Sequence, residues 1–344
     1  MSSPSKRKVS IKDVAATAGV SLQTVSRVVN GSEEVASATR ERVQAAIDSL
    51  GYRRNELARN LIQGRSRTLG VVCAGQDYLG GRQLNSGITA EAEAFGYALL
   101  IREHQPDDPE PDDRFVQGLL DRQVEGILWM LAERHTAHEA LIRRITETHG
   151  VPVVALVRSE SVGVPFSAFD NFGAGVMATR HLIERGRRRI VHIAGPEHAW
   201  DAQERLRGWR HAMEEAGLPA DDSHLVFGNW GPEGGEAGFL TLRERLGGFD
   251  AVFAGNDHTA LGAMSAAHKL GLQIPGDVAF IGVDDVKGSG WYVPPLSTIR
   301  RNRVEMGRQA VRMLARLIEA GRAGQTLALP DYLCAPELIL RESS

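Results

Sequence analysis

One short stretch, LQTVSR, brings together side chains whose chemistry suits DNA. Helical spacing turns Leu22, Gln23, Ser26 and Arg27 to one face of this stretch and Val25 to the opposite face. Amide and guanidinium groups can form paired hydrogen bonds with base edges in a major groove, whereas hydroxyl and cationic groups hold phosphates. The spacing therefore predicts a recognition helix.

Three short helices are expected to position that face. Val14 and Ala18 have helical spacing, Gly19 breaks the run, Ser21 can cap the second helix, and a third helix is predicted over residues 37–50. Together they enclose a small core and form a helix-turn-helix. Because such pairs of helices also occur in proteins that never bind DNA, the motif alone leaves simple packing as the alternative.

The net charge of −3 conceals an asymmetry between the two ends of the chain. Residues 1–67 hold 12 Lys and Arg against six Asp and Glu, so this part carries +6 and the remainder −9. A basic head on an acidic body suits a protein that holds a polyanion at one end only. The 344 residues, 42% hydrophobic and 24% charged, indicate a small head and a larger body of two lobes.

The sequence gives no support for a secreted, membrane or enzymatic protein. MSSPSKRKVS lacks the apolar core of a signal peptide, and no run reaches the ~18 apolar residues of a membrane span, so we expect a cytoplasmic location. The motifs GxSxG, GxxxxGK[ST] and HExxH are absent, and the histidines show no metal-ligand spacing with cysteine. We predict no catalytic residue, cofactor or metal, and expect Cys73 and Cys334 to be buried apolar thiols.

From Thr68 onward, short apolar strands alternate with amphipathic helices. The strands of a first series are TLGVVC, YALLI, GILWM and PVVALV, and those of a second are SAFD, RIVHIAG, HLVFGN, AVFAGN and VAFIGVDD. This pattern predicts parallel, doubly wound sheets with helices on both faces. A helix over residues 302–321 should return to the first lobe, and the strand CAPELILRES to the second.

The segments IKDVAATAGVSLQTVSRVVNG, TRERVQAAIDSLGY and NELARNLIQGRS resemble the DNA-binding head of the LacI/GalR family of bacterial repressors, and the resemblance continues to the last strand. It implies an N-terminal all-α helix-turn-helix head and an α/β, periplasmic-binding-protein-like body of two doubly wound lobes. The expected parts are a flexible arm (1–8), the helix-turn-helix domain (9–54), a hinge helix with linker (55–66), an N-terminal lobe (67–166 and 296–325) and a C-terminal lobe (167–295 and 326–344).

The resemblance also implies how the hinge would meet DNA. Asn55 would begin the hinge helix, Ala58 would approach the DNA, and Leu61 would wedge into the minor groove, with packing against the body as the alternative for Leu61. Arg54 replaces a proline common in the family, which should loosen the free hinge. The residues expected at DNA are Ser10, Ser21, Leu22, Gln23, Thr24, Ser26, Arg27, Asn30, Thr39, Tyr52, Asn55, Ala58 and Leu61.

A ligand is expected between the lobes, where open α/β sheets bind ligands at the carboxyl ends of their strands. By resemblance, Arg205 would bind hydroxyls or a carboxylate, Trp230 would stack on a sugar ring, and Asn256 and Asp284 would accept hydrogen bonds. The alternative for Asp257 is a cap of the next helix. The effector candidates are Tyr78, Arg82, Arg158, Arg205, Trp230, Asn256, Asp284 and Arg303.

Two of these positions depart from the family. Where one repressor of the family ends its fourth strand with a sugar-binding aspartate, this chain has Val157 followed by Arg158, and Arg303 replaces a phenylalanine of the cleft. These arginines are compatible with an acidic sugar, a phosphorylated sugar or salt bridges between the lobes, and the sequence does not decide.

The function implied is a homodimeric repressor of carbohydrate-utilisation genes. Each head would read one half-site of a pseudo-palindromic operator, and a small sugar in the cleft would release the DNA. One alternative keeps the fold but uses a purine or another co-repressor, which strengthens DNA binding. A less favoured alternative is a solute-binding protein, which would require a signal peptide and no basic head.

Overall fold

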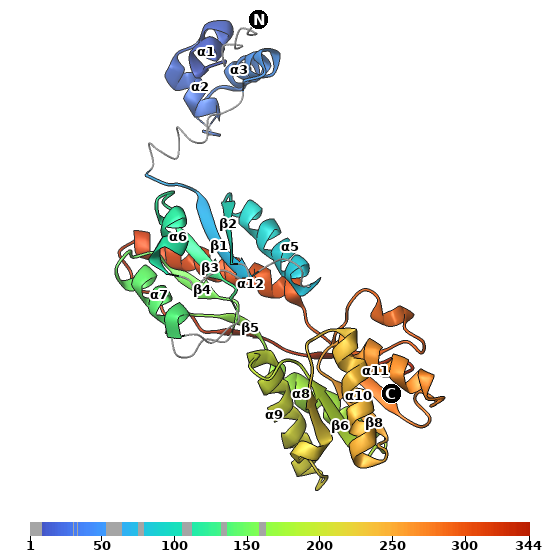
Figure 1. Ribbon diagram of the computed structural model, residues 1–344. Coiled ribbons are helices and arrows are strands. Elements are labelled where there is room, and N and C mark those ends of the chain that lie inside the picture. The colour runs from blue at the N-terminus through green and yellow to red at the C-terminus, as the bar shows by residue number, and fades with distance from the viewer. Residues whose placement is uncertain are drawn as a thin grey trace, which may run out of the picture. The chain divides into compact units, whose positions relative to one another are not determined.

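The computed structural model describes residues 9–29, 31–32, 34–52, 64–74, 79–104, 112–131, 136–157 and 163–344. The chain divides into two compact units, Met1–Ser66 and Arg67–Ser344, which we call the head and the body (Figure 1). Among the described residues, no helix has the length and apolar character needed to cross a membrane.

Three helices build the head: α1 (Ile11–Ala18), α2 (Leu22–Val29) and α3 (Ser37–Leu50). The helices predicted from the sequence are therefore confirmed. Gly19 ends α1 with φ of +64°, in the left-handed region that a side chain disfavours. Val14, Val25 and Val43, one from each helix, are fully buried, so the three apolar faces meet in one small core.

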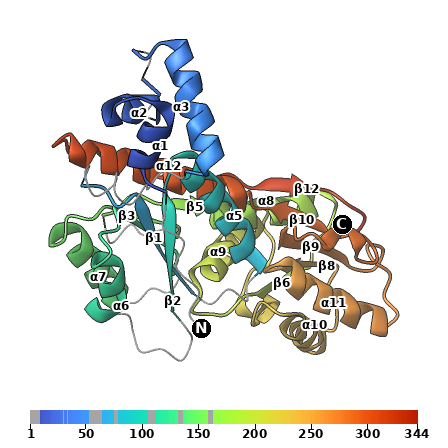
Figure 2. The ribbon, with the colours of Figure 1, turned by 90° about the horizontal axis from the view of Figure 1, so that it is seen from above.

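A four-stranded parallel sheet organises the first lobe of the body. Its strands, in spatial order, are β2 (Ala98–His104), β1 (Thr68–Ala74), β3 (Gly126–Trp129) and β4 (Val153–Ala155). Its helices are α5 (Leu79–Ala94), α6 (Asp113–Leu120), α7 (Thr136–Glu147) and α12 (Arg303–Arg322). In β1, Val71 packs in the cluster that includes α5 and α12, whereas Val72 packs in the one that includes α6 and α7. Figures 1 and 2 both show α5 and α12 side by side.

A six-stranded sheet organises the second lobe. Its strands, in spatial order, are β12 (Glu337–Ile339), β10 (Ser297–Arg300), β9 (Ala279–Asp284), β8 (Ala251–Ala254), β6 (Ile190–Ala194) and β7 (Leu225–Phe227). The strands run parallel except β12, which is antiparallel to β10. The apolar cluster on one face includes α8 (Asn171–Glu184) and α9 (Trp200–Glu215), and the cluster on the other includes α10 (Pro232–Leu246) and α11 (Asp257–Lys269). Two 3-10 helices, η1 (Asp222–His224) and η2 (Ser289–Trp291), lie in its loops.

The connections between the lobes differ from the predicted boundary at residue 296. β10 pairs with β9, so the chain stays in the second sheet until Arg300 and then enters α12. A further pair, β5 (Ser167–Phe169) with β11 (Tyr332–Cys334), forms a separate two-stranded parallel sheet. The returns of α12 to the first lobe and of β12 to the second agree with expectation. The sequence could not place β10, because a short strand between two lobes has the same apolar pattern in either sheet.

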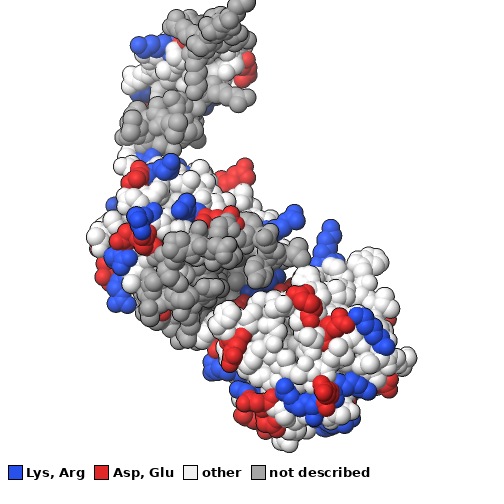
Figure 3. Space-filling view, viewed as in Figure 1, with Lys and Arg blue, Asp and Glu red and all other residues white. Residues whose placement is uncertain are grey.

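Smaller differences concern helix starts and surface charge. The sequence pattern predicts this helix only from Gln83, because two glycines of low helix propensity precede it; in the structure α5 begins at Leu79 and includes them. Cys73 and Cys334 are buried thiols, as predicted. On the face shown in Figure 3, acidic and basic side chains are intermixed over the body, so its negative net charge forms no single patch there.

Candidate DNA interface and effector site

The outer face of α2 presents the side chains predicted to read bases. Val25 and Val28 face the core of the head, while Gln23 and Arg27 are exposed and Ser26 is half-buried. Leu22 is 45% exposed, an unusual position for a leucine beside an available core. The helix therefore displays amide, guanidinium, hydroxyl and apolar groups on one surface, as the spacing predicted.

Hydroxyl groups at the helix starts serve the helices themselves. The backbone N–H of Thr24 donates to Ser21 Oγ at 3.1 Å, which caps α2 as expected. Ser10 precedes α1, and both its N–H and its hydroxyl donate to the carboxylate of Asp13, at 2.8 and 2.7 Å. These caps order the N-terminal ends of both helices, and that of α2, whose first turn holds no acidic residue, is suited to phosphate.

The remaining candidates in the head have mixed surroundings. Thr39 is half-buried in the first turn of α3, and Tyr52 is partly buried against the core of the head. Arg27 lies 3.9 Å from Glu34 in an exposed pair that is too weak to hold it away from DNA. The candidates outside the described residues are Asn30, Asn55, Ala58 and Leu61.

In the body, two glycines bring α8 and α9 into close contact. A Cβ atom on Gly175 would lie 2.3 Å from the carbonyl oxygen of Arg205, and one on Gly208 would lie 2.2 Å from the carbonyl oxygen of Phe172. The helices can approach this closely only because neither position carries a side chain. The contact places Asn171, the first residue of α8, beside the side chain of Arg205.

Arg205 lies at the centre of the predicted effector site and is 1% exposed. Its Nε donates to Asn171 Oδ1 at 2.9 Å, and its Nη1 donates to the carbonyl oxygen of Gly255 at 2.5 Å. Its guanidinium carbon lies 5.2 Å from the ring centre of Trp230. The guanidinium of Arg205 and the ring of Trp230 therefore lie together at the ends of β6 and β8. A planar hydrogen-bond donor beside an aromatic face suits a ligand with a polar ring.

Ion pairs join Arg205 to four further charged residues. Nη1 of Arg301 lies 3.1 Å from Asp201 and 3.6 Å from Asp284, and Arg303 Nη2 lies 2.8 Å from Asp284. Arg205 Nη2 lies 3.6 Å from Asp201. We call these five residues, Asp201, Arg205, Asp284, Arg301 and Arg303, the arginine network. The ion pair between Arg205 and Asp201 coexists with the proposed ligand position.

The charges in the arginine network shift one another's pKa values. Burial raises the pKa of the Asp201 carboxyl, but Arg301 and Arg205 outweigh it, so this pKa lies below its usual value. Asp284 behaves in the same way under Arg303 and Arg301. Burial, followed by repulsion from Arg301, lowers the pKa of Arg205 to about 10. Both acids are therefore ionised at neutral pH, and guanidinium groups stay protonated in proteins.

Asn256 has a structural role beside Trp230. Its Oδ1 accepts from the N–H of Thr259 at 2.8 Å, which caps α11, and its Nδ2 donates to the carbonyl oxygen of Trp230 at 3.0 Å. Trp230 itself has φ of +68°, and its ring covers Gly195. Asn256, and not Asp257, is therefore the helix cap, and it holds the tryptophan backbone in place.

Comparison with known proteins assigns the chain to a family. Residues 10–55 match the model of bacterial regulatory proteins of the lacI family, and residues 179–344 match a periplasmic binding protein-like domain. The HTH-type transcriptional repressor PurR of Haemophilus influenzae is 33% identical over 336 residues, which cover 97% of this chain and 98% of the relative. The chain belongs to the lacI family. It is a DNA-binding transcriptional regulator.

Other relatives and solved structures agree with this assignment. The HTH-type transcriptional regulator CelR of Thermobifida fusca is 32% identical over 98% of this chain and 99% of the relative. A complex of the transcriptional regulator CelR with cellobiose has a TM-score of 0.71 at 30% identity, covering 98% of this chain and 100% of that one. The lac repressor dimer bound to operator and an anti-inducer has a TM-score of 0.83 at 28% identity, covering 98% and 99%.

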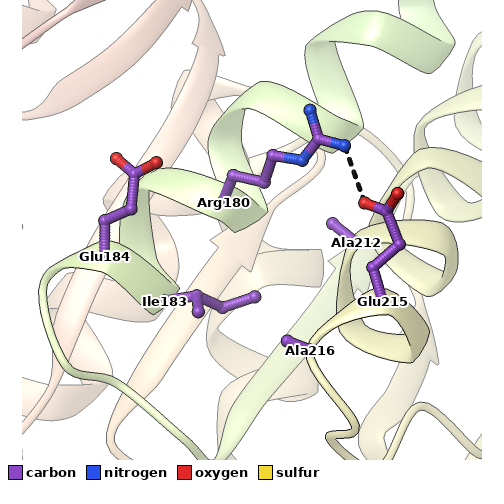
Figure 4. A pocket seen from close by; sticks show the side chains of 6 residues that line it. All are labelled: Arg180, Ile183, Glu184, Ala212, Glu215 and Ala216. Carbon is purple, nitrogen blue, oxygen red and sulfur yellow. Dashed lines mark hydrogen bonds and ion pairs between the residues drawn. The ribbon is translucent and has the colours of Figure 1, made fainter.

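Arg82, another effector candidate, is exposed in the first turn of α5 of this lacI-family chain. The effector candidates Tyr78 and Arg158 lie outside the described residues. Figure 4 shows a pocket of about 200 Å³ between α8 and α9, and none of the arginine network residues lines it. Its lining residues are Arg180, Ile183, Glu184, Ala212, Glu215 and Ala216.

Sequence reasoning missed several residues of the site. Asn171 and Arg301 hold Arg205 and Asp284, yet neither was chosen as a ligand contact. Asp257, for which a helix cap was the alternative to a ligand contact, has a fully buried carboxylate that accepts from Thr298 Oγ1 at 2.5 Å, from the N–H of Val286 at 2.9 Å and from Ser289. Burial and the neighbouring Asp284 raise the pKa of Asp257 to about 7. Its position directly after AVFAGN was the available signal.

Proposed function

We propose that this lacI-family regulator is a homodimeric repressor of carbohydrate-utilisation genes, released from a pseudo-palindromic operator when a small sugar binds between its lobes. It acts in the cytoplasm and catalyses no reaction. The observation that carries the proposal is the placement of Arg205 against Trp230, within a body that follows a DNA-reading head.

The DNA side of the proposal is supported by α2. Gln23 and Arg27 can each form two parallel hydrogen bonds to a base edge, and Leu22 can contact a thymine methyl group. Ser21 and Thr24, at the positive end of the helix, suit a phosphate. A single head offers only one such helix, so a second copy is needed for a palindromic site.

Two exposed apolar side chains in the second lobe support the second copy. Trp291 is 87% exposed and Val293 is 76% exposed, in the loop that follows β9. Large apolar side chains at neighbouring positions are typical of contact surfaces between proteins. The similar lac repressor structure is a dimer on its operator. We therefore place part of the contact between copies at this loop.

The effector side rests on the chemistry at the ends of the second sheet. An aromatic face and a planar, buried guanidinium bind the ring and the oxygen atoms of a sugar. CelR was solved with cellobiose. A ligand that closes the two lobes would change the contact between copies and so the spacing of the heads.

Selection from randomised double-stranded DNA tests the DNA side. The full chain should enrich a pseudo-palindrome, and the Gln23→Ala, Arg27→Ala double variant should enrich none. A single, unrepeated half-site as the selected sequence would contradict the dimeric mode.

Analytical ultracentrifugation tests the contact between copies. Trp291→Asp should weaken self-association. The control is Trp200→Asp at the first residue of α9, outside the proposed contact, which should weaken self-association less.

Thermal unfolding with a panel of sugars tests the effector side. Cellobiose, glucose, galactose and ribose are added singly, and a true ligand raises the unfolding temperature by mass action. The same sugar should lower the affinity for the selected operator, measured by fluorescence anisotropy. A sugar that stabilises the protein and raises DNA affinity would instead identify a co-repressor.

A further inference from the structure

Two sets of ion pairs meet at neighbouring residues of the second lobe, and they differ in charge balance. Asp285 pairs with Arg300 at 2.8 Å and with Arg341 at 2.6 Å, and Arg300 also pairs with Glu337 at 3.2 Å. This set contains two acids and two arginines. The arginine network, which begins at Asp284, contains two acids and three arginines, so it carries one more positive charge than negative.

Two other acids of the second lobe, Asp257 and Asp170, are held by partners outside the arginine network. The carboxylate of Asp257 is held by Ser289, Thr298 and the N–H of Val286, and its pKa of about 7 leaves it only partly ionised at neutral pH. The carboxylate of Asp170 caps α8 by accepting from the N–H of Gly173 at 2.8 Å. The charges that act most on Arg205 all belong to the arginine network itself.

Hydrogen-bond donors also exceed acceptors here. Asp284 already accepts from Arg303, and Asp201 accepts from Arg301 and from Asn171 Nδ2, at 3.1 and 2.9 Å. Arg301 Nε, by contrast, is buried and has no hydrogen-bond partner among the described residues. Each guanidinium has five N–H donors and no acceptor, so three of them hold more donors than two carboxylates can accept.

A ligand that completes this site has to supply acceptors and negative charge. A neutral sugar brings hydroxyl groups, which donate as well as accept, and leaves the charge unchanged. A carboxylate or phosphate brings acceptors only and removes the surplus positive charge, and guanidinium groups bind both in a paired geometry. Arg301 and Arg303 flank Asn302 at the start of α12, whose N-terminal end adds further positive potential.

We propose that the effector is an anionic sugar, whose carboxylate or phosphate is bound by Arg301 and Arg303 while Arg205 and Trp230 hold its ring. The proposal rests on the proposed function and specifies its ligand. It also assigns Arg303 a role in choosing the ligand: Arg303 pairs with Asp284 in the structure and turns toward the anion when the ligand binds.

Thermal unfolding of the full chain with matched sugar pairs tests the charge requirement. The pairs are glucose with glucuronate, gluconate and glucose 6-phosphate, and galactose with galacturonate; sodium phosphate and sodium sulfate are added alone. We expect at least one charged sugar, and not its neutral partner, to raise the unfolding temperature and change operator affinity. The carboxylates and the phosphate ester distinguish the two sources of charge.

Variants at the two sets of ion pairs test the residues. Arg303→Gln should weaken binding of the charged sugar by about tenfold or more, the value of one lost charge-assisted hydrogen bond. The matched control is Arg300→Gln, in the balanced set, which should leave that affinity unchanged. Unfolding without ligand verifies that both variants are folded, and Arg301→Gln replaces Arg303→Gln if the latter is unfolded.

The outcomes separate this inference from the proposed function. A neutral sugar that binds better than its charged partners overturns the anionic requirement and leaves the sugar-responsive repressor standing. Equal loss of binding in the Arg300 and Arg303 variants, or an equal response to inorganic phosphate, also overturns it. If no sugar of either kind changes stability or operator affinity, both the anionic effector and sugar control are wrong.

Discussion

In the head, Gln23 and Arg27 project from α2 and are exposed, whereas in the body Arg205 is buried and Asp284 and Arg303, two further effector candidates, are bound to each other. Arg205 touches Asn171, Gly255 and Trp230. The difference teaches that the two sites answer to different constraints. Exposed side chains that bind DNA need only a stable helix to carry them, so substitutions there can change DNA binding without changing the stability of the fold. Buried side chains that bind a ligand are part of the core, so substitutions there change ligand binding and stability together.

Replacing Arg205 should give the largest effect, because it breaks the coupled site. Arg205→Met leaves two buried acceptors, Asn171 Oδ1 and the carbonyl oxygen of Gly255, without their donor, and each unsatisfied buried acceptor costs about 1–3 kcal/mol. Urea unfolding should show this loss, and the response to sugar should disappear.

The matched control for that variant is Arg207→Met on the same helix. The side chain of Arg207 is 63% exposed and pairs with Glu204 at 2.6 Å. An exposed pair is worth about 0–1 kcal/mol, so this variant should retain stability and sugar response. Equal losses in the two variants would show that Arg205 has no special place in the body.

Removing the ionisable group at Asp257 should give a pH-dependent effect. Its pKa is about 7 in the folded protein, against about 3.9 when unfolded, so the folded state binds more protons between these values. Stability from this group is therefore largest at low pH and falls as pH rises through 7. From about pH 5 to about pH 7 the change is at most about 3 kcal/mol, since one pKa unit is worth 1.36 kcal/mol.

The measurement is the free energy of unfolding in urea of Asp257→Asn and of the unchanged (wild-type) protein, across the same pH range. The stability advantage of the unchanged protein should shrink as pH rises. Asp284 and Tyr292, which face Asp257, remain in both proteins, as do the acids whose pKa is lowered, so their contributions largely cancel in the difference. An advantage that stays constant or grows with pH would place the titration elsewhere.

These contrasts also explain what the sequence could predict. The helices of the head and the outward set on α2 follow from spacing within one segment, and the alternating strands and helices of the body follow from local pattern. The boundary near residue 296 was wrong because β10 contains no local signal for its sheet. A pattern in one segment says which face is apolar, but not which distant segment will cover it.

The arginine network required contacts between remote segments. Asp201 meets Arg301 across 100 positions, and Arg205 meets Asn171 across 34. Arg205, Asp284 and Arg303 were chosen from a resemblance, which did not point to Asn171 or Arg301 as ligand contacts. Asn256 and Asp257 are adjacent polar residues at a strand end, and either type can cap a helix. The structure assigns the cap to Asn256, which has an extended backbone and accepts from the N–H of Thr259.

Within the head, two apolar truncations on α2 should separate packing from reading. Val25→Ala removes two methyl groups from the core and should cost about 2 kcal/mol, because burial of a methylene is worth about 0.8 kcal/mol and a cavity remains. Leu22→Ala, on the exposed face, should change stability little. Hydrogen exchange should show faster exchange in the head for Val25→Ala only, with the body unchanged. Faster exchange of the body would mean that the two units do not unfold separately.

Gln23→Ala should give the smallest structural effect and a specific functional one. The exposed amide supports no core contact, so unfolding should be unchanged, while loss of a base contact weakens operator binding by about 1–3 kcal/mol and relaxes the preference at one position of each half-site. The control is Gln44→Ala, an exposed glutamine of α3 whose amide donates to Asp48 at 3.0 Å. Anisotropy titrations with the selected operator and its single-base variants measure both. Two outcomes would contradict the role of Gln23: Gln44→Ala weakens operator binding as much as Gln23→Ala does, or Gln23→Ala weakens binding to every DNA sequence equally. In either case base reading belongs to other residues of the head.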